Sequence, residues 1–138
     1  MAEQLFQPVN TPIGILKGRD AIFLDKLDID IQQGTLTLEG GFNGRLASEP
    51  ISEEVGYSLT FYDVLAFRVI ELDSWYYKSA SSFDEVVNSE WCARLGGKVD
   101  ESFKHYLVQT YDDVIDVVCR KFTLTIKASE PSLQPIVE

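Results

Sequence analysis

The sequence contains few of the residue types on which enzyme chemistry usually depends. It has a single histidine, His105, and two cysteines, Cys92 and Cys119, which belong to no CxxC or His/Cys ligand spacing. A Ser-His-Asp or Cys-His arrangement could therefore use only His105, and the ligand set of a structural zinc site is missing. Two cysteines so far apart in a chain of this size are typical of reduced, partly buried thiols.

Motifs for nucleotide, nucleophile and metal chemistry are also lacking. The glycines are scattered and match neither GxGxxG nor GxxxxGKS/T, and GxSxG does not occur. Asp112, Asp113 and Asp116 form a cluster of carboxylates, but their spacing differs from that of an EF-hand loop. Turn chemistry accounts for Asp112 and Asp113 without a metal. We therefore predict no catalytic residues, no metal and no cofactor.

Basic residues are scarce as well. The chain has 12 Lys and Arg against 22 Asp and Glu, a formal net charge of −10. Such a surface repels phosphate backbones and anionic lipids, so we expect binding neither to nucleic acid nor to membranes. A basic protein partner would be attracted, although the same charge also serves solubility alone.

Long hydrophobic runs are absent too. No apolar stretch approaches the roughly 18 residues that cross a bilayer, and the start MAEQLFQPVN has no basic region followed by an apolar one. We therefore expect a cytoplasmic protein. The length of 138 residues and the hydrophobic content of 45% predict one domain over 1–138 with its own core. Residues 1–20 are expected to form an extended lead-in, and residues 128–138 a loose tail.

What the chain does contain is a period-two alternation of apolar and polar side chains, typical of strands with one buried face. The clearest predicted hairpin is LDIDIQQGTLTLEG. A two-residue loop at positions 33–34 keeps the apolar side chains on one face and places Ile31 opposite Leu36. The same register puts Asp28 across from Glu39, an unfavourable pair.

A second hairpin is predicted in FKHYLVQTYDDVIDVVCRKF, with residues 112–113 as its loop. This register places Tyr106 opposite Cys119 and makes one face mostly apolar. His105 falls on the other face, half exposed near Arg120. Since His105 and Cys119 then point to opposite faces, they cannot form a dyad.

Two further regions favour strands. Residues 122–127 alternate strictly, and the segment 57–78 is rich in aromatic and β-branched side chains. The second region predicts two strands, or one long strand with a bulge near Asp63. Its nearly continuous apolar run at 64–72 is typical of a central strand covered on both faces.

One helix is predicted near residues 83–95. Ser82 and Glu85 have the spacing of a capping box, and the glycines at 96–97 supply a stop. The apolar row between them has helical spacing. It consists of Phe83, Val87, Trp91 and Leu95.

These patterns together predict a mainly β, β-rich α+β fold. It is an antiparallel β-sandwich or curled sheet of about seven or eight strands with one helix near residues 83–95. The one-sided strands need a cover, which a second sheet or this helix supplies.

The most suggestive binding feature is the segment DSWYY at residues 73–77. Its three successive aromatics cannot all point to one face of a strand, and Trp and Tyr are favoured anchors at protein interfaces and stack on sugars. An alternative is that Trp75 and Tyr77 are core residues with Tyr76 at a rim. The predicted binding residues are Asp73, Trp75, Tyr76, Tyr77, Asp112, Asp113 and Asp116.

The function that these features favour is a non-enzymatic binding protein with an acidic surface. It is similar in character to immunity proteins and antitoxins, which inhibit basic proteins through complementary charge. A small-molecule or carbohydrate-binding β-domain is the alternative, and an enzyme of unknown class the second alternative. The strand at 122–127 also suggests a homodimer if it lies at a sheet edge, although Lys121 and Lys127 are equally consistent with edge protection.

Overall fold

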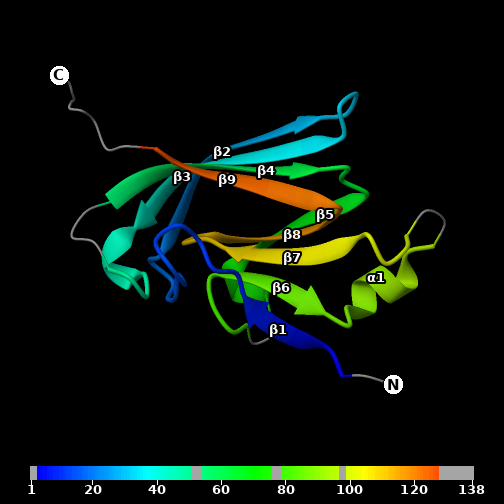
Figure 1. Cartoon of the computed structure of the whole chain (residues 1–138), viewed down its shortest axis with the longest axis horizontal. Helices are drawn as coiled ribbons and strands as arrows, with labels where there is room; N and C mark the ends of the chain where they lie inside the picture. Colours follow the sequence, from blue (N-terminus) through cyan, green and yellow to red (C-terminus); the bar gives the residue numbers. More distant parts are fainter. Residues whose placement is uncertain (1–2, 51–53, 76–78, 97–98, 128–138) are drawn as a thin grey trace.

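A computed structural model describes residues 3–50, 54–75, 79–96 and 99–127. Two antiparallel sheets pack as a sandwich with one short helix (Figure 1), so the predicted mainly β sandwich is confirmed. The strands are β1 (Leu5–Pro8), β2 (Ile22–Asp30), β3 (Thr35–Asn43), β4 (Glu54–Tyr62), β5 (Ala66–Glu71), β6 (Phe83–Val87), β7 (Lys104–Gln109), β8 (Asp113–Cys119) and β9 (Lys121–Lys127). The helix is α1 (Glu90–Arg94), and the two 3-10 turns are η1 (Gly44–Leu46) and η2 (Leu72–Ser74).

The order of strands decides which of them have a free side. The larger sheet has the order β1-β6-β7-β8-β5 and the smaller one β2-β3-β4-β9. Four strands, β1, β5, β2 and β9, are therefore edges. No helix in the described part of the chain has the length and hydrophobicity that crossing a membrane requires.

The core between the sheets consists of alternate residues from both of them. The bulkiest fully buried side chains include Phe42, Tyr57 and Phe61 from the smaller sheet and Phe83 from the larger one. The rings of Phe42 and Tyr57 stack with centroids 4.3 Å apart. The outer face of the larger sheet carries a second apolar cluster, which contains Val86, Leu107, Val114, Phe6, Leu72 and Trp75. The larger sheet is thus covered on both faces.

The first predicted hairpin forms, but its register differs from the expected one by two residues. Ile29 pairs with Leu36, and residues 31–34 make the connection. The turn is longer because Gly34 N–H donates to Asp30 O at 2.8 Å while Gln33 N–H donates to Asp30 Oδ1 at 3.1 Å. A shift of two residues keeps the side chains of both strands, β2 and β3, on their predicted faces. The expected contact of two carboxylates across the strands is replaced by a pairing of Lys26 with Glu39.

The second predicted hairpin shows the same two-residue error. Tyr106 pairs with Val117, not with Cys119. Thr110 closes the turn, since its N–H donates to Asp113 O at 2.7 Å and its Oγ1 accepts from Asp113 N–H at 3.0 Å. His105 and Cys119 point to opposite faces as predicted, but His105 is buried and lies across from Val118. The expected half-exposed position near Arg120 is therefore wrong.

The middle segment forms two strands in two different sheets. The chain turns at Asp63, whose φ of 56° is in the left-handed region. The prediction of a central strand covered on both faces is wrong, because β5 is the edge of the larger sheet. Phe67 and Val69 consequently keep 36% and 48% of their surface exposed.

The helix is shorter than predicted and begins later. Residues 83–87 form β6, and α1 covers only residues 90–94, with Ser89 as N-cap in place of Ser82. A strand lets Phe83 enter the sandwich core and Val86 the outer cluster, on opposite faces of one sheet. Asp84 accepts N–H bonds from residues 80 and 81, which holds a bend where the helix was expected to begin.

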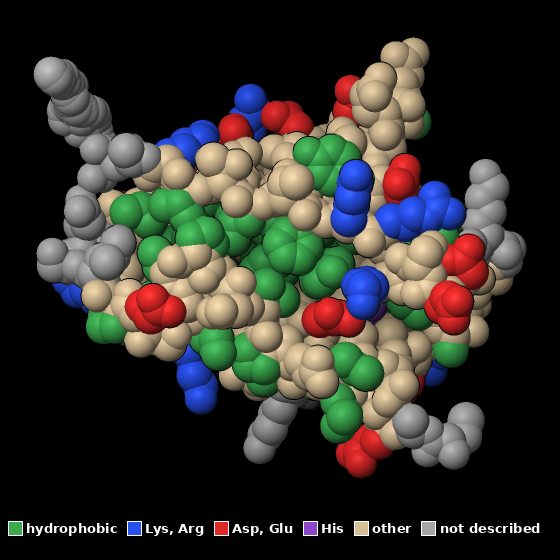
Figure 2. All heavy atoms as spheres, in the orientation of Figure 1, with side chains coloured by type: hydrophobic (Ala, Val, Ile, Leu, Met, Phe, Trp, Pro, Cys, Tyr) green, Lys and Arg blue, Asp and Glu red, His purple; other side chains and the backbone are tan. Residues whose placement is uncertain are grey.

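The two ends of the described chain each contain one strand, β1 and β9. The lead-in contains β1, which pairs with β6, while the region around Ile13 makes only isolated bridges. The strand β9 is confirmed, and it is an edge. Figure 2 shows apolar side chains gathered between the two sheets on the face that β9 borders. Pairing of β9 with a second copy stays a prediction, and residues 128–138 lie outside the described part.

Gly40 provides a test of the β2–β3 packing. It lies opposite a bulge in β2, and a Cβ at this position would clash with the carbonyl oxygen of Phe23. We expect Gly40→Ala to lower the free energy of unfolding by about 2–3 kcal/mol, measured by urea denaturation. Gly56→Ala on β4 is the control, because its Cβ would meet only the Lys127 side chain at 3.4 Å or more and a backbone oxygen at 3.8 Å. Equal losses in both variants would contradict this account.

Candidate functional site

Three of the predicted binding residues meet at one corner of the larger sheet. Asp113 is the cross-strand partner of Glu71, and Leu72 N–H donates to Asp112 O at 2.9 Å. Asp73 follows directly in η2. The pairing of β5 with β8 thus gathers carboxylates that are far apart in the sequence.

The other predicted residues do not join this corner. Asp116 is on the opposite face of β8 from Asp113 and is fully buried. Trp75 is half-buried and packs against the outer apolar cluster. Tyr76 and Tyr77 lie outside the described residues. Within the described ranges, no group of His, Cys, Asp or Glu is arranged to hold a metal ion.

Asp116 is the centre of a buried polar network. Its Oδ1 lies 2.6 Å from His105 Nε2, and its Oδ2 accepts from Arg68 Nε and Nη2 at 3.2 and 3.0 Å. His105 Nδ1 lies 2.7 Å from Ser89 Oγ at the start of α1. The side chains of Asp116 and His105 are 0% and 5% exposed, so water screens this network little. The network joins β5, β7, β8 and α1.

His105 therefore bridges Asp116 and Ser89, with one ring nitrogen hydrogen-bonded to each. Ser89 Oγ in turn accepts the Cys92 N–H at 3.1 Å as helix cap. The order Ser-His-Asp is present, but the Ser89 oxygen also serves as the cap of α1 by accepting a backbone N–H. We interpret the arrangement as a structural tie between the sheet and α1.

The cysteines are both free thiols, as predicted. Cys119 lies in the sandwich core, and burial raises the pKa of its thiol to about 12. Burial also raises the pKa of Cys92, against a lowering effect of its hydrogen bond with Ser89. Because the thiolate is the nucleophile, neither position favours a reactive cysteine.

A hollow of about 90 Å³ lies beside the network on the outer face of the larger sheet. Trp75 and Trp91 both line it, together with Arg68 and His105. The guanidinium of Arg68 lies over the Trp91 ring at 4.0 Å, and the rings of Trp91 and His105 meet edge to face at 5.3 Å. Sequence reasoning missed this hollow because the residues come from four separate segments.

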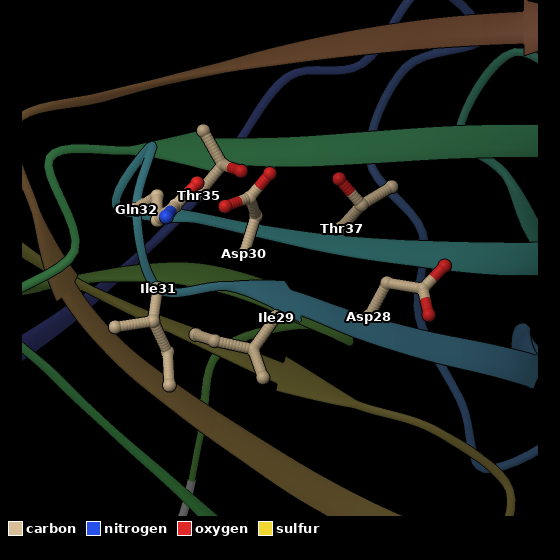
Figure 3. Close-up of a pocket in the computed structure, with 7 residues that line it drawn as sticks. All are labelled: Asp28, Ile29, Asp30, Ile31, Gln32, Thr35 and Thr37. Carbon is tan, nitrogen blue, oxygen red and sulfur yellow. The ribbon is translucent and has the colours of Figure 1, made fainter.

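A second feature is the exposed side between the edge strands β2 and β5. Phe67 and Val69 pair with core residues of β8, so their side chains face inward, although both are exposed. On the hairpin, Ile29 is 42% and Ile31 87% exposed. Figure 3 shows both isoleucines on one side of the hairpin and the Asp30 carboxylate on the other. The inner faces of two edge strands are thus incompletely covered.

Two contacts place these edge strands along the same side of the sandwich. At one end of β2, Tyr111 N–H donates to Ile22 O at 2.9 Å beside the β7–β8 turn. At the other end, Val64 N–H donates to Gly34 O at 2.9 Å just before β5. We call the apolar surface along this side the β2–β5 edge surface. It comprises Ile29, Ile31, Leu65, Phe67 and Val69.

Comparison with protein-family models, with curated proteins and with solved structures found no match for this chain.

The buried network predicts a large stability cost when its centre is removed. Asp116→Ala leaves the buried His105 Nε2–H and the Arg68 guanidinium without their acceptor. We expect a loss of about 3–5 kcal/mol in the free energy of unfolding, measured by urea denaturation. Asp112→Ala in the exposed β7–β8 turn is the control and is expected to change stability by under about 0.5 kcal/mol. A small loss for Asp116→Ala would show that the network contributes little.

Proposed function

We propose that this protein is a non-enzymatic binding protein that docks a basic protein partner on the β2–β5 edge surface. An immunity- or antitoxin-type inhibitor, which blocks a basic protein by covering it, is the most specific form of this proposal. It extends the expectation from the acidic sequence by naming the surface that makes the contact.

The observation that carries the proposal is the exposure of inward-facing apolar side chains at two neighbouring edges. Ile31 is 87% exposed at the tip of a hairpin that projects from the sandwich (Figures 1 and 2). Val69 keeps 48% of its surface exposed although it pairs with the core residue Ile115. Large apolar side chains that stay exposed along one side of a sandwich are typical of protein–protein contacts.

The edge strands also offer backbone groups to a partner. Among the described strands, β5 pairs only with β8, and β2 pairs only with β3. An extended segment of a partner that adds to such an edge gains main-chain hydrogen bonds, while its alternate side chains reach the apolar surface.

Charge around this surface favours a basic partner. Asp28 and Asp30 project from the opposite face of the hairpin (Figure 3), and Asp63 stands at the turn before β5. Lys26 compensates Asp28 at 3.3 Å, and Arg120 lies 3.9 Å from Asp63, while Asp30 has no ion pair among the described residues. In a chain of net charge −10, the long-range field adds to these local carboxylates.

Comparative capture tests the proposal. The wild-type protein, Ile31→Ser and Val69→Ser are immobilised and exposed to lysate of the source cells, and retained proteins are quantified by mass spectrometry. We expect one basic protein to be retained by the wild type and reduced at least tenfold by either variant, because buried interface anchors carry most of the binding free energy. Salt should speed its release, since complementary charge assists the association.

Leu46→Ser is the matched control. Leu46 is 37% exposed on η1, at the end of β3 opposite the hairpin tip, so this variant should retain the same protein as the wild type. Equal capture by all four proteins would contradict the proposed surface. For the inhibitor form, the purified partner should lose its activity on addition of one equivalent of the wild type and keep it with Ile31→Ser.

A further inference from the structure

We infer that the hollow between Trp75 and Trp91 is a binding site for a small planar carboxylate, such as an aromatic carboxylic acid. This site lies on the outer face of the larger sheet and goes beyond the proposed docking surface. It also gives the small-molecule alternative a defined place and a chemical class.

The walls of the hollow suit a flat apolar body. Trp75 and Trp91 line it with Phe6, Ile70 and Val86. Its volume of about 90 Å³ is of the order that a ring-sized molecule requires. Sites for small organic ligands are mostly apolar in this way and contain a few polar groups that set orientation.

Arg68 supplies a fixed group for an anion. Two N–H bonds to Asp116 and the stacking on Trp91 at 4.0 Å hold its guanidinium in place. Its side chain is still 42% exposed, and a guanidinium has further N–H groups to donate. Because the orientation is already set, a carboxylate that binds there orders little additional side chain.

Arg94 and Glu90 are exposed charged side chains at the opening of the hollow. Both belong to α1, line the hollow and are exposed, so the hollow is accessible to solvent. Neither side chain forms an ion pair with a described residue. Arg94 would attract a carboxylate and Glu90 would repel it. Asp116 pairs with Arg68 at 3.0 Å and offsets part of its charge, but it is fully buried and does not face the opening.

The stacked guanidinium argues against the opposite class of ligand. Aromatic side chains such as these bind organic cations when their faces are free. Arg68 already covers the Trp91 face, and Arg94 adds a second positive charge at the opening. A cation would therefore meet Arg94 and the exposed part of Arg68 at the opening, where Glu90 is the exposed carboxylate of the lining.

Tryptophan fluorescence reports on ligand binding at this site, since the chain has two tryptophans and both line the hollow. The protein is titrated with benzoate, with its neutral isostere benzamide and with phenyltrimethylammonium, with excitation at wavelengths where the probes do not absorb. We expect a saturable change with benzoate at micromolar to low millimolar concentration and at least tenfold weaker binding of benzamide. The ammonium probe should bind more weakly still.

Two exposed substitutions on α1 give opposite expectations. Arg94→Gln should weaken benzoate binding about tenfold, and Glu90→Gln should strengthen it a few-fold. Arg45→Gln on η1 is the control and should leave the titration unchanged. The thermal unfolding midpoint of each variant verifies that it is folded.

Three results would overturn the inference. They are the absence of a saturable benzoate signal, equal affinity for benzoate and benzamide, and preference for the ammonium probe. These outcomes leave the docking proposal untouched, because Ile31 lies in the β2–β3 hairpin and Val69 is on the opposite face of β5 from Arg68 and Ile70, which line the hollow.

Discussion

Coverage of the larger sheet on both faces is the constraint on which the rest of the structure depends. Every residue of β8 after the first is buried, with Ile115 and Val117 facing the sandwich and Val114 and Val118 facing outward. The outward face also contains Asp116, a carboxylate that can be buried only if it is paired. Arg68 from β5 and His105 from β7 meet this requirement, and Ser89 extends the network to α1.

This constraint explains why the hollow and the helix lie where they do. α1 has only five residues and could not be stable alone, so its position depends on contacts with the sheet. Ser89 and Trp91 make those contacts through His105 and Arg68. The hollow remains between these anchors, and Arg68 in its wall is held by a network that the fold needs in any case.

Among the described residues, the smaller sheet has no comparable apolar cluster on its outer face, and its β2–β3 hairpin projects past the larger sheet (Figure 1). The β2–β3 hairpin therefore exposes polar residues on one face and isoleucines on the other (Figure 3). The proposed partner surface exists because the β2–β3 hairpin of the smaller sheet is not fully covered by the larger sheet. Ligand binding and partner docking would then use different faces of one sandwich.

Period-two alternation allowed the sequence alone to predict the strands β2, β3, β4, β7, β8 and β9 and the antiparallel sandwich, because which side chains share a face of a strand depends only on local spacing. Ile29, Leu36, Val108 and Phe122 all lie on the faces that this alternation indicated. The predicted acidic residues Asp112 and Asp113 likewise lie in and beside a turn.

Tertiary structure decided what local spacing leaves open. A register shift of two residues preserves both faces, so alternation could not distinguish the predicted hairpin pairings from the observed ones. Residues 83–87 belong to an apolar row with helical spacing, and the two apolar clusters on opposite faces of the larger sheet selected a strand instead. The position of β5 at an edge, the pairing of His105 with Asp116 and the hollow beside Trp75 depend on strand order, which is set by packing between distant segments.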